Sequence, residues 1–96
     1  MMFTNERYLT REVAERVPID IQLLMWDLVE RIEEKDYLQI FELIPKGSEI
    51  VEIIHKQEIP EVTSIYEMEN NEIKNKMKLY IIDNGQYSTM MFSHEY

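Results

Sequence analysis

The clearest pattern in the sequence is a set of apolar residues at helical spacing between residues 18 and 35. These residues recur at i, i+3, i+4, i+7, i+8 and i+11, and they are Ile21, Leu24, Met25, Leu28, Val29 and Ile32. Such spacing forms one apolar stripe along a helix, and Ile19, Leu23 and Trp26 widen it. Pro18 suits a first helical position, so we predict one long amphipathic helix from about Pro18 to Lys35. A shorter helix over 11–16 is predicted after Thr10, a suitable N-cap.

After residue 36 the pattern changes to the alternation that is typical of strands. The segments rich in strand-forming residues are 37–43, 50–57, 62–66, 78–82 and 87–92, with a shorter candidate at 7–10. The segment Pro45–Ser48 predicts a turn between the first two of these strands. Asn84-Gly85 predicts a hairpin with a type I′ turn, which needs positive φ at both central residues. Residues 67–76 are predicted to form an exposed loop because acids, asparagines and lysines dominate them.

These elements predict the α+β class, with residues 1–96 forming a single domain. The expected architecture is one long amphipathic helix packed on an antiparallel sheet of about four to five strands. If 62–66 is a strand, Pro60 just before it favours a position at the edge of that sheet.

The charge of the chain restricts its partners. Ten Lys and Arg residues stand against 19 Asp and Glu, which gives a net charge of −9 at pH 7. This balance argues against binding to nucleic acid or to an anionic membrane surface, since both need a basic surface. No apolar run approaches the ~18 residues that predict a transmembrane helix, and the first residues lack a secretory signal pattern. We therefore expect a cytoplasmic protein that binds neither nucleic acid nor membrane.

The motifs of known catalytic and cofactor sites are missing from the sequence. There is no cysteine, and the two histidines, His55 and His94, do not have a metal-binding spacing. Neither a phosphate-binding glycine loop nor a serine nucleophile motif is present. The sequence thus identifies no catalytic residue, cofactor site or metal ligand, and it favours a binding protein over an enzyme.

Short motifs spread along the chain resemble a known family. They are Thr4–Arg11, Val17-Pro18, Gln22-Leu23, Met25-Trp26, Asp36–Gln39, Phe41–Leu43, His55–Glu58, Pro60-Glu61 and Tyr87–Met90. Together they resemble domain-of-unknown-function family nine-sixty, small uncharacterised proteins of staphylococci, related Gram-positive bacteria and their phages. The resemblance covers almost the whole chain in collinear order. It implies a bacterial cytoplasmic setting and leaves the activity open.

Two hypotheses about function follow. The first is a non-enzymatic acidic protein-interaction or accessory module of a bacterium or phage, which binds a protein partner or forms a weak homodimer. A dimer would pair the edge strand near Tyr66 and depend on salt, or it would use apolar helix residues such as Trp26. The alternative is a small enzyme or ligand-binding domain with a pocket near His55 and Tyr87, and with Glu52 close by.

Overall fold

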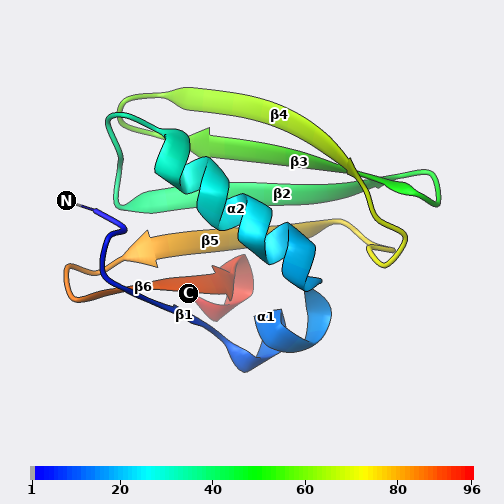
Figure 1. The fold of residues 1–96 in the computed structure, drawn as a ribbon, viewed down its shortest axis with the longest axis horizontal. Coiled ribbons are helices and arrows are strands. Elements are labelled where there is room, and N and C mark those ends of the chain that lie inside the picture. Colours follow the sequence, from blue (N-terminus) through cyan, green and yellow to red (C-terminus); the bar gives the residue numbers. More distant parts are fainter. Residues whose placement is uncertain (1) are drawn as a thin grey trace.

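The structure is a computed structural model that describes residues 2–96. Its elements follow one another along the chain as Figure 1 shows. They are β1 (Glu6–Leu9), α1 (Arg11–Arg16), α2 (Ile19–Arg31), β2 (Leu38–Lys46), β3 (Ile50–Gln57), β4 (Val62–Glu69), β5 (Met77–Asp83), β6 (Tyr87–Phe92) and the 3-10 turn η1 (Ser93–Glu95).

The six strands form one mixed sheet in the order β1-β6-β5-β2-β3-β4. The strands from β2 to β6 pair in antiparallel fashion, whereas β1 runs parallel to β6. β1 and β4 therefore lie at the two edges of the sheet. The prediction of an edge strand after Pro60 agrees with this order, although β4 extends to Glu69 instead of ending at Tyr66.

The predicted architecture of one long helix on a four- or five-stranded antiparallel sheet is wrong. Strands contain 44% of the residues and helices 23%, and the sheet has six strands with one parallel pair. α2 has 13 residues and ends at Arg31, four residues earlier than predicted. Glu33, Glu34 and Asp36 come directly after it, and negative charge at a helix C-terminus opposes the helix dipole. The broad combination of α and β elements remains right.

Both predicted hairpins are present, and the limits of β3 and β6 match the prediction. The turns of both hairpins differ from the prediction. β2 continues through Pro45 to Lys46, which pairs with Ile50. The turn at Asn84-Gly85 is not type I′, because Gly85 has a φ of 97° while Asn84 is not among the residues with positive φ. Instead, the Asn84 carboxamide oxygen accepts hydrogen bonds from the backbone N–H groups of Gln86 and Tyr87.

The core lies between α2 and one face of the sheet. α2 crosses this face diagonally in Figure 1, and α1 continues the same layer through its buried Val13. Met25 and Leu28 are buried as predicted. Ile19 and Leu23, which were expected to widen the buried stripe, instead stay 66% and 62% exposed. They lie on the outer side of the helix, so the apolar stripe is narrower than the sequence suggests.

Candidate functional site

The face of the sheet that α1 and α2 leave uncovered carries many apolar side chains. We call it the open face. Successive side chains along a strand point to opposite faces, and paired residues of neighbouring strands point to the same face. The strand pairing therefore shows which residues lie on the open face. Its apolar members are Tyr8, Leu38, Ile40, Ile44, Ile50, Ile54, Ile65, Tyr80, Ile82, Tyr87 and Met91. Most of these are half-buried by their neighbours, and Ile65 is 61% exposed.

This composition is unusual for a sheet face that is in contact with water. An antiparallel sheet with one solvated face normally alternates apolar residues toward the core with polar residues outward. In β2 the outward positions include Leu38, Ile40 and Ile44, so most of them are apolar. On β1 and β6 the rings of Tyr8 and Tyr87 meet edge to face with centroids 5.3 Å apart. Contiguous exposed apolar surface of this kind is typical of interaction sites.

At the centre of the open face the charged groups are paired with one another, whereas Glu67 and Glu69 project from its β4 margin and have no ion pair among the described residues. Glu42 lies 3.1 Å from the ammonium of Lys76 and 3.4 Å from that of Lys56. Glu52 lies 3.8 Å from Lys46. The Lys76 ammonium, with help from Lys56, lowers the pKa of the Glu42 carboxyl against the opposing effect of burial. The centre of the open face is therefore close to neutral, although the chain as a whole is strongly acidic.

A second candidate surface lies on the other side of the sheet, where the end of α2 approaches β4. A cleft of about 310 Å³ opens there. It is lined by Leu28, Arg31, Ile32, Glu33, Glu34, His55, Pro60, Val62, Ser64 and Tyr66. His55 and Ser64 are direct partners in the pairing of β3 with β4. Because paired residues project to the same face of a sheet, their side chains share this cleft.

Beneath the cleft lies a chain of buried polar side chains. The Nε2 of His55 lies 2.7 Å from the Oε1 of Gln39, and the Nε2 of Gln39 donates to the Oε1 of Gln57 at 2.7 Å. Gln57 in turn donates to the backbone carbonyls of Glu34 and Pro60, both at 2.9 Å. The network thus ties the loop after α2 and the β3–β4 turn to the middle of the sheet.

The backbone fixes the direction of these hydrogen bonds. The N–H of Asp36 can only donate, and it donates to the Oε1 of Gln57 at 2.9 Å. The amide nitrogen of Gln39 donates to the same oxygen and to the carbonyl of Asp36, so the Oε1 of Gln39 faces His55. His55 must therefore carry its proton on Nε2, and its Nδ1 keeps a free lone pair. Burial lowers the pKa of His55 to about 4, so the ring is neutral at pH 7.

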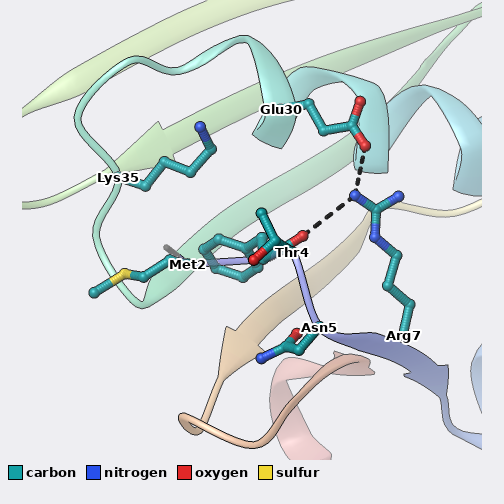
Figure 2. A pocket seen from close by; sticks show the side chains of 7 residues that line it. Met2, Thr4, Asn5, Arg7, Glu30 and Lys35 are labelled. Carbon is teal, nitrogen blue, oxygen red and sulfur yellow. Dashed lines mark hydrogen bonds and ion pairs between the residues drawn. The ribbon is translucent and has the colours of Figure 1, made fainter.

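A third hollow, of about 430 Å³, lies beside the start of the chain (Figure 2). In Figure 2 Arg7 reaches from β1 toward Glu30 on α2. The two form an ion pair of 2.5 Å, and Arg7 also lies 4.8 Å from the ring of Trp26. Lys35 donates to the carbonyl of Ile32. The charged groups of this hollow are therefore already paired, which indicates a role in attaching the N-terminal segment to α2.

The segment at residues 2–5 is also held by Asp83 at the end of β5. One carboxylate oxygen accepts from the backbone N–H of Phe3 at 2.7 Å, and the other accepts from that of Gly85 at 2.7 Å and from Asn5 at 3.2 Å. Burial raises the pKa of Asp83, but these donors outweigh it and hold the pKa below its usual value.

The structure separates the five candidate residues into three groups. His55 and Tyr66 both line the cleft beside β4. Glu52 and Tyr87 lie on the open face, on the opposite side of the sheet from His55. Trp26 is only 7% exposed under Arg7, so it offers little surface for a dimer. A single pocket that contains both His55 and Tyr87 is not formed.

Sequence reasoning missed the two glutamines that orient His55. Gln39 and Gln57 are buried at positions that face the core, with exposures of 0% and 2%. An amide at an inward position of a predicted strand is a usable signal, because a buried polar group needs hydrogen-bond partners.

Within residues 2–96 the structure contains no group of three or more His, Cys, Asp or Glu side chains that could hold a metal ion. In the same part of the chain, none of the helices is long and apolar enough to cross a membrane. Acidic side chains occur on both sides of the sheet, with Glu42 and Glu52 on the open face and Asp20 and Glu30 on α2.

Comparison with family models gives a match over residues 6–95, nearly the full chain. The chain belongs to DUF960, a family described as staphylococcal protein of unknown function. This confirms the resemblance that the sequence motifs indicated. The fold is also that of a solved Enterococcus faecalis protein of unknown function, with a TM-score of 0.84 and 16% sequence identity. The similarity covers 98% of this chain and 92% of the other. Comparison with curated proteins gives no match.

Proposed function

We propose that this DUF960 protein is a non-enzymatic interaction module whose main binding surface is the open face of the sheet. The observation that carries the proposal is the apolar composition of outward positions on β2 and its neighbours, including Ile40, Tyr80 and Ile82. The occupant we propose is a second copy of the chain, packed face to face across a twofold axis. Sheets pack in this way in sandwich folds, about 10 Å apart.

The charge of the open face supports a second copy as the occupant. A net charge of −9 repels identical chains, so self-association requires a surface that lacks the acidic excess. The centre of the open face meets this requirement because Glu42 and Glu52 are paired with Lys46, Lys56 and Lys76.

The size of the molecule also supports this proposal. Its principal extents are 38 × 27 × 21 Å, and the sheet spans the two larger dimensions in Figure 1. A face of that size can bury the ~800 Å² per partner that is usual for specific interfaces.

Sedimentation velocity of two matched variants tests the proposal. Ile40→Lys places a charge in the middle of the open face, whereas Leu23→Lys places the same charge on the exposed side of α2. We expect wild type and Leu23→Lys to form dimers equally well. Ile40→Lys should weaken dimerisation by about a hundredfold or more, since two unpaired ammonium groups would be buried by symmetry. Circular dichroism checks that both variants are folded.

A wild-type protein that stays monomeric at high protein concentration would refute the second copy as occupant. Equal weakening by both variants would place the interface elsewhere. Salt gives a further check: raising it from ~0.01 M to ~0.15 M screens the repulsion between two chains of net charge −9, so the dimer should be as strong or stronger at the higher salt.

A further inference from the structure

The cleft beside β4 and the free edge of that strand form one continuous feature, which the proposed dimer interface does not use. β4 pairs with β3 on one side only, and no strand within residues 2–96 pairs with its other side (Figure 1). Val62, Ser64 and Tyr66 of the same strand form one wall of the cleft, and the end of α2 forms the other. A segment lying along β4 would therefore place alternate side chains at the mouth of the cleft.

We infer that this edge binds an extended basic peptide as a seventh strand, with a lysine or arginine side chain of the peptide inserted into the cleft. Adding a strand to an exposed sheet edge is a common mode of peptide recognition. The backbone of β4 supplies hydrogen bonds that do not depend on sequence, and the cleft supplies the preference for a basic side chain.

The end of the cleft is built to accept a hydrogen bond. His55 is 2% exposed and lines the cleft, and its Nδ1 has no hydrogen-bond partner within residues 2–96. The Gln39–Gln57 network holds the ring with its proton on the opposite nitrogen, as derived above. Nδ1 can therefore accept a hydrogen bond from an ammonium or guanidinium group. The hydroxyl groups of Ser64 and Tyr66 lie along the same wall.

The charges around the cleft and edge select for a cation. Glu33 and Glu34 line the cleft, and Glu58 and Glu61 lie in the turn just before β4. Arg31 is the basic residue that lines the cleft, and it is already paired with Asp27 at 2.5 Å. This excess of negative charge around exposed backbone groups favours a basic strand and repels an acidic one.

The proposal is independent of the dimer, because the open face and the cleft lie on opposite sides of the sheet. The probe is a fluorescent seven-residue peptide of alternating lysine and valine, and the measurement is fluorescence anisotropy. We expect binding to wild type and equally to the open-face variant Ile40→Lys. The same peptide with glutamate in place of lysine should not bind. The absence of a dimer in sedimentation and the absence of peptide binding in anisotropy are therefore separate results.

Methylation of the peptide backbone distinguishes strand addition from simple charge attraction. In a β-strand, alternate N–H groups face the neighbouring strand. N-methylation of one alternate set should abolish binding, whereas methylation of the other set should leave it almost unchanged. Equal binding by both methylated peptides would overturn the proposal, as would complete absence of binding by the unmodified peptide.

A matched pair of double variants tests the position of the site. Glu33→Gln with Glu34→Gln removes two charges at the cleft, and Glu6→Gln with Glu15→Gln removes two exposed charges away from it. We expect the first pair to weaken binding by about threefold to tenfold, in line with exposed charge interactions, and the second pair to have a much smaller effect. Equal effects of the two pairs would show general attraction to an acidic protein and overturn the proposal.

NMR tests directly whether the Nδ1 of His55 accepts a hydrogen bond from the peptide. A purely structural role of His55 would not change the signal measured. Long-range ¹H–¹⁵N NMR spectra report each ring nitrogen separately. The Nδ1 resonance of His55 should move when the lysine peptide is added and stay in place with a peptide of threonine and valine. Movement with both peptides, or with neither, would contradict a hydrogen bond from the basic side chain to Nδ1.

Discussion

Replacing Gln57 by methionine tests how strongly the buried network supports the cleft. Gln57 is 2% exposed, and its carboxamide takes part in four hydrogen bonds. Methionine has a similar length and no hydrogen-bonding amide, so Gln57→Met would remove all four without leaving a large cavity. The N–H of Asp36 and the carbonyls of Glu34 and Pro60 would lose their partner.

The expected loss of stability follows from the number of groups left without a partner. Each buried polar group without a hydrogen bond costs about 1–3 kcal/mol. Loop carbonyls that reach water recover part of this cost, and the apolar methionine side chain offsets more of it. We therefore expect Gln57→Met to lower the free energy of unfolding by about 2–4 kcal/mol.

Gln22→Met is the matched control. Gln22 is also buried, at 5% exposed, but its amide makes one hydrogen bond, to the carbonyl of Val17 at 2.7 Å. The same substitution should cost about 0–1 kcal/mol there. Urea unfolding measures both values, provided that the slope with denaturant stays the same. Amide hydrogen exchange should accelerate at Asp36 in Gln57→Met. Equal loss in the two variants would refute the network as the source of stability.

Three further substitutions and conditions test other parts of the fold. Leu28→Ala should cost about 2–5 kcal/mol by opening a cavity under α2, and an unchanged urea midpoint would show that Leu28 is not packed in the core. The pKa of His55 is about 4 in the folded protein and ~6.5 in the unfolded chain. As the pH falls, the imidazole of the unfolded chain is therefore protonated first, which favours unfolding. Stability should therefore drop by about 3 kcal/mol between pH ~6.5 and pH ~4, and a His55→Gln variant should lack this part of the pH dependence. Asp83→Asn should cost about 1–3 kcal/mol and accelerate hydrogen exchange at Phe3, because the charge-assisted bonds to Phe3 and Gly85 weaken; unchanged exchange would contradict this.

The parts of the fold that could be predicted are those with strong local signals. β3 and β6 alternate clearly and are bounded by turn residues, and their predicted limits match the structure. The two hairpins were predictable for the same reason. The type of turn at Asn84-Gly85 was not, because side chains such as Asp83 and Asn84 bond to the loop backbone and support a longer connection.

The parts that could not be predicted depend on distant segments. The candidate strand at 7–10 corresponds to β1, but its parallel pairing with β6 some 80 residues later could not be predicted, because all four residues of β1 are exposed and show no alternation in burial. The open face has a similar origin. Nothing local in β2 says whether Ile40 or Phe41 will face the helix, since both are apolar. That choice is made when α2 packs on one side of the complete sheet.

The candidate site was predicted only in fragments. His55 and Tyr66 were selected as individual residues, and pairing of β3 with β4 brings their side chains to the same cleft. The glutamines that orient His55 were not selected, because their role arises from contacts between β2, β3 and two loops. The burial of His55 was not predicted either: its ring is 2% exposed and stacks on that of Phe41, with centroids 4.3 Å apart.

The distribution of charge explains how one small sheet can have two different binding surfaces. Free strand edges invite pairing with a second copy, and proteins oppose this with charged residues on the edge. β4 carries Glu67 and Glu69, which project to the margin of the open face, and Glu58 and Glu61 lie in the turn before it, so two copies of this edge would repel each other. The same acids attract a basic strand, while the centre of the open face, where Glu42 is neutralised by lysines, has no such barrier to a second copy. Added salt should therefore weaken binding of the basic peptide and leave the dimer as strong or stronger, because screening reduces both the attraction at the edge and the net repulsion between two acidic chains.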